Sequence, residues 1–157
     1  MVKTEIQSRT LSVIANVMGS GAFILIDRLD EIAIPNLDKW EAIGVGLTYT
    51  GPQKGAMSLW APTSFMKTLC ANMLGADDES GLTTGNLVDA LKEILNMVLG
   101  NVLTEVYGNE PVFDLDLPQL LPAKTISTST ANSFRLWFSA EGEPIMFLVE
   151  IEPPKTK

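Results

Sequence analysis

Histidine is absent from this 157-residue chain, and cysteine occurs once, as Cys70. Without imidazole there is no histidine general base, no Ser-His-Asp triad and little basis for a transition-metal site. A single cysteine excludes an intramolecular disulfide and a thiolate zinc site. Because Cys70 lies in the apolar stretch 65–71, we interpret it as a buried structural thiol and not a nucleophile. No ligand set for a metal is visible.

Long apolar runs and basic clusters are also lacking. No segment approaches the length needed to span a bilayer, and residues 1–7 carry no signal-peptide core. The net charge is -8 and no basic patch stands out, which argues against binding to nucleic-acid phosphates. We therefore expect a cytoplasmic protein without membrane insertion. Its partner should offer a basic surface or bring its own metal ion.

The rest of the composition is that of an ordinary globular protein, with 46% hydrophobic and 19% charged residues. The length predicts a single domain, residues 1–157, with an N-terminal helical segment over 1–20 and a frayed tail over 152–157. The patterns predict helices over 3–18, 64–74 and 87–107, and strands over 23–26, 42–49, 56–60, 133–138 and 145–151. An acidic loop over 76–86 and a proline-punctuated segment over 111–123 connect them. The expected fold is α+β, an antiparallel-rich mixed sheet packed against about three helices.

The helix expected over 87–107 is strongly apolar but carries one narrow polar stripe. Residues three and four apart share a helix face. The stripe consists of Asp89, Glu93, Asn96, Gly100 and Thr104. A carboxylate and a carboxamide one turn apart, backed by core residues, could orient a water molecule or hold a partner's cation. The residue that precedes this helix, Asn86, is its expected N-cap.

Two segments carry a family resemblance. The first runs from 44 to 59, with its Gly-Val-Gly-Leu-Thr and Lys-Gly-Ala-Met-Ser-Leu pieces, and continues through the helix that ends in Ala-Asn-Met-Leu-Gly at 71–75. The second is the E-x-x-N pair Glu93 and Asn96, followed by Met97 and later Gly100. Together they resemble the CheC/CheX/FliY family of chemotaxis phosphatases, most of all CheX, over roughly residues 40–150. One departure is Leu95, where many members have glycine; we expect it to face the core.

The resemblance implies a CheX-like layered domain and hydrolysis of the acyl phosphate on a CheY-type response regulator. Asn96 would then position the attacking water, and Glu93 would grip the regulator's active-site lysine. Gly100 would let the partner's backbone approach, and Asp89 is assigned with it to partner binding, although a carboxylate in the first helical turn also suits the helix dipole. The chain would need no cofactor of its own, because the phosphorylated regulator supplies Mg²⁺.

Other interpretations stay open. Glu93 and Asn96 could be ordinary solvated residues, or the protein could be a non-catalytic docking module for a phosphorylated regulator or a flagellar switch component. Residues 11–20 resemble 91–100, with Asn16 in the place of Asn96 and Val13 in the place of Glu93, as a degenerate repeat or by coincidence. CheX-like relatives also imply a homodimer. The long, apolar late strands would offer an edge for it, unless 111–123 covers that edge.

Overall fold

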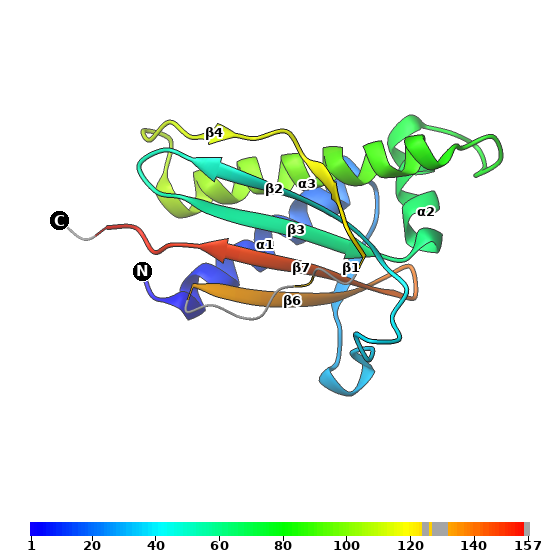
Figure 1. Ribbon diagram of the computed structural model, residues 1–157, viewed down its shortest axis with the longest axis horizontal. Helices are drawn as coiled ribbons and strands as arrows, with labels where there is room; N and C mark the ends of the chain where they lie inside the picture. The colour runs from blue at the N-terminus through cyan, green and yellow to red at the C-terminus, as the bar shows by residue number, and fades with distance from the viewer. Residues whose placement is uncertain (124–125, 127–131, 156–157) are drawn as a thin grey trace.

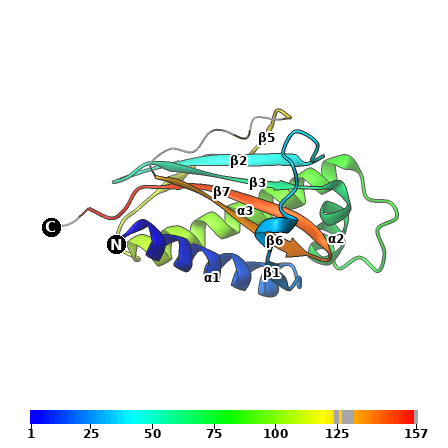
Figure 2. The same ribbon diagram turned by 90° about the horizontal axis from the view of Figure 1, so that it is seen from below.

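The computed structural model describes residues 1–123, 126 and 132–155. It has two layers, a sheet and a set of helices on one of its faces (Figures 1 and 2). The helices are α1 (Lys3–Gly21), α2 (Thr63–Leu74) and α3 (Thr84–Tyr107), with a short 3-10 turn, η1 (Glu31–Ala33), after the first strand. The layers confirm the predicted α+β class.

The sheet has the strand order β1-β6-β7-β3-β2-β4, and β5 also pairs with β2. Its strands are β1 (Ile26–Arg28), β2 (Ile43–Thr50), β3 (Gly55–Ala61), β4 (Asp114–Leu115), β5 (Gln119–Leu121), β6 (Ser133–Ala140) and β7 (Glu143–Ile151). Every pairing among the described strands is antiparallel, so the expected mixed sheet contains no parallel pair there.

The core lies between the helices and one face of the sheet. Alternate residues of β2, namely Val45, Leu47 and Tyr49, are buried and belong to the same apolar cluster as Leu91 and Ile94 of α3. Side chains alternate faces along a strand and recur every three to four residues along a helix, so each element supplies one apolar face. This packing fixes which side of α3 faces solvent.

Most predicted elements are confirmed, with shifted ends. The hairpin of β2 and β3 and the helix α2 lie where expected, and Gly75 ends α2 in the left-handed conformation with φ 66°. Helix α1 continues to Gly21 instead of stopping at 18. The strand expected over 23–26 was misplaced, because β1 pairs with β6 only over Ile26–Arg28. Helix α3 begins three residues earlier than predicted.

Of the two late strands expected to offer a sheet edge, β7 does not do so. Strand β7 lies between β3 and β6, so it is internal. The segment 111–123 provides β4 and β5, which pair with β2 at the other side of the sheet, and it does not cover the late strands. Strand order depends on pairing between distant segments, which local hydrophobic patterns do not specify.

Helix α3 is anchored at both ends. At its start, Thr83 Oγ1 accepts from the Asn86 backbone N–H at 3.1 Å, and Asn86 Oδ1 accepts from the Thr83 N–H at 3.0 Å. At its end, the Tyr107 hydroxyl lies 3.3 Å from that of Tyr49 and donates to the Glu152 carbonyl at 2.5 Å. Burial raises the pKa of both phenols, so they remain neutral hydrogen-bonding groups.

The chain after β7 is tied back to the sheet. Besides the Glu152 carbonyl, the Pro153 carbonyl accepts a hydrogen bond from the buried Gln53 side chain. These bonds fall within the segment expected to fray. The last residues of that segment, 156–157, lie outside the described residues.

Candidate functional site on helix α3

The structure places the polar stripe on one exposed face of α3. Asp89, Glu93, Asn96 and Thr104 are exposed and Gly100 is half-buried. The rise of an α-helix separates Glu93 from Asn96 by about 4.5 Å along the axis, and the whole stripe extends over about 22 Å. The structure brings these residues to one face of the helix, as expected.

The side chains of Glu93 and Asn96 are uncommitted. Neither makes a hydrogen bond or ion pair within the described part of the chain, whereas their neighbours on the helix do. Asn101 Nδ2 donates to the Met97 carbonyl at 2.7 Å, and Thr104 Oγ1 donates to the Gly100 carbonyl at 3.2 Å. The pair is therefore available to a partner without breaking any internal contact.

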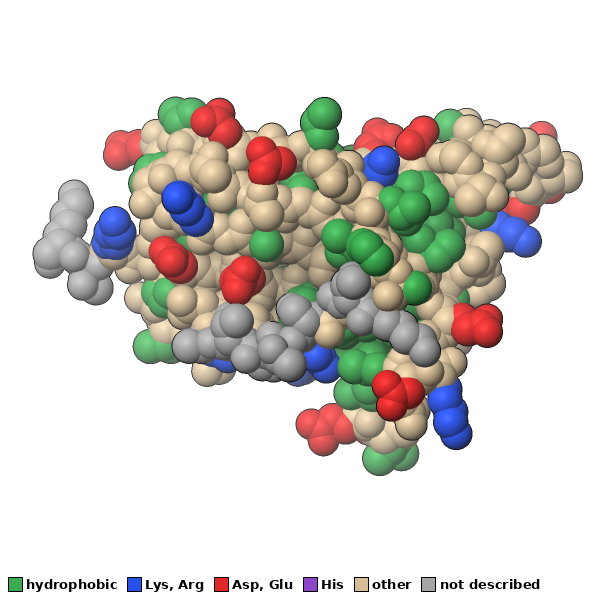
Figure 3. All heavy atoms as spheres, viewed as in Figure 1, with side chains coloured by type: hydrophobic (Ala, Val, Ile, Leu, Met, Phe, Trp, Pro, Cys, Tyr) green, Lys and Arg blue, Asp and Glu red, His purple; other side chains and the backbone are tan. Residues whose placement is uncertain are grey.

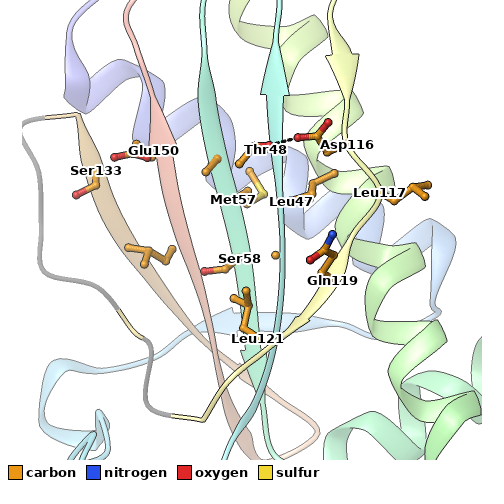
Figure 4. Close-up of a pocket in the computed structure, with 13 residues that line it drawn as sticks. Leu47, Thr48, Met57, Ser58, Asp116, Leu117, Gln119, Leu121, Ser133 and Glu150 are labelled. Atoms are coloured by element: carbon orange, nitrogen blue, oxygen red, sulfur yellow. Dashed lines mark hydrogen bonds between the residues drawn. The ribbon is translucent and has the colours of Figure 1, made fainter.

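Glu93 and Asn96 lie on the convex surface of the helix, whereas Gly100 and Thr104, further along the stripe, line a hollow of about 180 Å³ together with Phe113 and Leu115. A second hollow, of about 370 Å³, lies over the outer face of the sheet, between β5, β2, β3 and β7 (Figure 4). Acidic and hydrophobic side chains are interspersed over this outer face (Figure 3). Trp40 and Trp137 also pack against each other there, with ring centroids 4.8 Å apart and ring planes tilted by 52°. An exposed pair on a convex helix suits insertion into a partner's site better than capture of a small molecule.

Leu95 and Gly100 fit the interpretation drawn from the sequence. Leu95 is fully buried, so the residue that departs from the family pattern is a core residue, as predicted. A Cβ added at Gly100 would meet no atom within 4 Å, so internal packing does not require glycine there. Glycine inside a helix is destabilising relative to alanine, which leaves close approach from outside as a reason for it.

Helix α1 runs antiparallel to α3, with Arg9 beside Glu105 at one end and Gly21 beside Met97 at the other. Asn16 is exposed on α1, but the position one turn before it holds the half-buried Val13. The segment resembling 91–100 therefore presents a carboxamide without a carboxylate.

The surroundings of α3 add two observations. Cys70 is buried, as predicted; burial and the nearby Asp89 charge raise its pKa, which keeps the thiol protonated. In the described ranges, no group of three or more histidine, cysteine, aspartate or glutamate side chains is arranged to hold a metal ion.

The helices of the described residues are also too short or too polar to cross a membrane.

One neighbour of the site was not singled out from the sequence. Phe23, just beyond the end of α1, is 74% exposed and has φ 55°. The sequence pattern placed Phe23 at the start of the strand expected over 23–26, where a phenylalanine is an ordinary apolar residue, so nothing marked its exposure.

Comparison with solved structures shows the same fold in several proteins. A chemotaxis protein CheX from Vibrio vulnificus superposes with a TM-score of 0.73 at 20% identity, covering 97% of this chain and 99% of that one. CheX from Desulfovibrio desulfuricans superposes with a TM-score of 0.72 at 19% identity, covering 94% of this chain and 99% of that one. The CheX-CheY-BeF3-Mg²⁺ complex from Borrelia burgdorferi gives 0.64 at 15% identity, with 92% and 96% covered. At these identities the likeness shows the fold.

The family is shown by the sequence itself. No curated protein matches the chain. Residues 43–139, more than half of the chain and including all of the stripe, match the family model described as chemotaxis phosphatase CheX. The chain therefore belongs to the CheX family of chemotaxis phosphatases.

Proposed function

We propose that this protein stimulates hydrolysis of the aspartyl phosphate on a CheY-type response regulator, using Glu93 and Asn96. The observation that carries the proposal is the exposed, uncommitted Glu93–Asn96 pair on a convex helix of a CheX-family domain. The Borrelia burgdorferi relative, solved with CheY, BeF3 and Mg²⁺, supports a CheY-type partner for this family member.

The chemistry requires little from this chain. An aspartyl phosphate is a mixed anhydride whose regulator supplies Mg²⁺ to neutralise the phosphoryl oxygens. A water oxygen attacks phosphorus in line, the bond from phosphorus to the carboxyl oxygen breaks, and the aspartate leaves as a carboxylate. The proton lost by the water ends on the inorganic phosphate. Catalysis then depends on placing the water, which is an effect of position and orientation.

Asn96 is suited to hold that water. A carboxamide both accepts a hydrogen bond from the water and donates one to a phosphoryl oxygen, and it carries no charge to repel the phosphoryl group. Its position on a rigid, doubly anchored helix keeps the side chain at a fixed depth when the helix docks. Asn96 acts as the water-positioning residue.

Glu93 supplies the charge that docking needs. It precedes Asn96 by almost one turn and would pair with the lysine in the regulator's active site. Asp89, one turn further back, adds a second carboxylate toward the same partner, and Gly100 leaves space for its backbone. The stripe thus presents two acids to the cationic side of the regulator and a neutral amide to the phosphoryl group.

The direct test is the decay of ³²P-labelled CheY-type regulators from the source organism, with and without the protein. We expect at least one regulator to lose its label faster when catalytic amounts are added. If one binds in its BeF3 form but its decay rate stays unchanged, the protein is a docking module and not a phosphatase. If none binds, the proposal fails.

A further inference from the structure

Phe23 has an exposed ring on a constrained backbone. Its side chain is 74% exposed and its φ is 55°. A bulky residue rarely adopts the left-handed region, and the position just after a helix is normally filled by glycine. The other described non-glycine residue with positive φ, Glu141, has an ordinary explanation, because it forms a two-residue hairpin loop with Gly142 between β6 and β7.

The backbone on both sides of Phe23 is held in place. The Ala22 carbonyl accepts from Asn72 Nδ2 at 2.9 Å, which joins the end of α1 to the end of α2 (Figure 2). The Ile24 N–H donates to the Met18 carbonyl at 3.1 Å, and the Ile24 side chain is fully buried. The strained residue is therefore fixed with its ring directed to solvent, and not part of a flexible loop.

Phe23 also lies beside the proposed site. A Cβ added at Gly21 would come within 2.9 Å of Met97 Cε, so the end of α1 touches the residue that follows Asn96. Phe23 is two residues after Gly21, so the Cα atoms of the two residues are at most about 8 Å apart. Leu74, at the end of α2, is 64% exposed and lies two residues after Asn72. We call Phe23 and Leu74 the apolar rim.

We propose that the apolar rim is a specificity surface that seats an apolar patch of the phosphorylated regulator next to its active site. This rests on the proposed function, since the occupant is the same regulator. Two carboxylates and an amide give the stripe charge complementarity but little apolar contact, and an exposed aromatic ring beside them can bury a large apolar area in a pocket of the partner. Backbone strain at an exposed residue is itself a mark of a functional position.

The test exploits the strain. Glycine adopts a positive φ without steric strain, so the melting temperature of Phe23→Gly should equal or exceed that of the wild type. The same variant should bind the regulator loaded with BeF3 and Mg²⁺ about tenfold more weakly by calorimetry. Its dephosphorylation rate at saturating regulator should stay near that of the wild type, because the ring seats the partner and does not position water.

Two further variants sharpen the result. Phe23→Asn keeps a residue that tolerates positive φ and should lose affinity to the same extent. Ile32→Ser is the control: this still more exposed residue belongs to η1, at the opposite side of the molecule from α3 (Figure 1), and the variant should bind like the wild type.

Unchanged affinity in both Phe23 variants would overturn the apolar rim while leaving the phosphatase intact. A variant whose mass in light scattering falls to half that of the wild type would also overturn it, by assigning Phe23 to contact with a second copy. Failure of the wild type to bind any regulator would sink both proposals, and that result is distinct from the other two.

Discussion

At the scale of single residues, the chemistry of this protein depends on side chains that the fold leaves unused. Asn96 and Glu93 contribute no internal hydrogen bond or ion pair in the described part of the chain. Their loss should therefore cost function without costing stability, which is the opposite of what a core residue would show. Variants at the stripe separate the functional interpretation from the structural one.

Asn96→Ala should reduce stimulated dephosphorylation by about 100-fold, the low end for loss of a positioning group. Binding to the BeF3-loaded regulator should largely survive, because the group acts on the transition state. The decay of ³²P-labelled regulator measures dephosphorylation, and calorimetry measures binding. Asn101→Ala is the matched control, since its carboxamide bonds only to its own helix backbone. Near-wild-type turnover in Asn96→Ala would remove Asn96 from the mechanism.

Glu93→Lys should weaken binding and turnover together. It brings a cation against the regulator's lysine, and like charges at an interface cost on the order of several kcal/mol. Circular dichroism and the melting temperature should match those of the wild type, because the side chain is exposed. Glu31→Lys, an equal charge change on η1, should bind normally. An unfolded Glu93→Lys protein would mean that Glu93 is structural and that the site is assigned wrongly.

Gly100→Ala should stabilise the folded protein and, at the same time, weaken its binding to the regulator. The added methyl group meets no atom within 4 Å, and alanine is favoured over glycine inside a helix by about 0.5–1 kcal/mol. Urea unfolding should show that gain, while affinity for the regulator should fall because the methyl group blocks its approach. Gly19→Ala on α1, also with open space around it, should give the gain alone. Unchanged affinity in Gly100→Ala would exclude Gly100 from the contact.

At the scale of elements, α3 is the part that makes the stripe usable. Its apolar face, including Leu91, Ile94 and Leu95, is buried against the sheet and the other two helices, and this packing fixes the rotation of the helix about its axis. The capping box at Thr83 and the Tyr107 hydrogen bonds fix its two ends. The rotation decides which residues are exposed, and the ends decide how far the stripe can move.

Thr83→Ala should lower the free energy of unfolding by about 1 kcal/mol, because it removes the side-chain acceptor for the Asn86 N–H. Thr84→Ala, at the first helical residue, should change stability much less. Turnover at saturating regulator should be retained in both, since the cap lies about three turns before Glu93. Urea unfolding checks the prediction, and equal stability of the two variants would contradict the assignment of Thr83 as the cap.

At the scale of the whole molecule, one side of the sheet offers a surface for a second copy. The short strands β4 and β5 border β2 there, and Leu117 and Leu120 are exposed beside them. Exposed strand edges and apolar residues beside them favour pairing between chains. Asn96 lies on α3 and belongs to neither of these strands.

The protein should therefore be a homodimer in solution, with the stripe of each copy open to a regulator. Light scattering at micromolar concentration should give about twice the 17.0 kDa chain mass. A mass near that of one chain would contradict the dimer and leave the phosphatase proposal standing, because the stripe lies within a single chain.

The local features of this protein follow from short stretches of its sequence. The apolar periodicity of 87–107 predicted both the helix and its exposed stripe, and the burial of Leu95 followed from the same spacing. The paired hairpin strands and the inert Cys70 were equally accessible, because each depends on a few neighbouring residues. The start of α3 was missed because Asn86 suits an N-cap, while its actual role is the reciprocal partner of Thr83.

How these pieces meet depends on the packing of the folded chain. The internal position of β7, the pairing of 114–121 with β2 and the approach of Gly21 to Met97 all join segments far apart in the sequence. The exposed, strained Phe23 depends on the same contacts, through Asn72 and the buried Ile24. Such contacts reflect the summed packing of the whole core, and a local hydrophobic pattern is compatible with several of them.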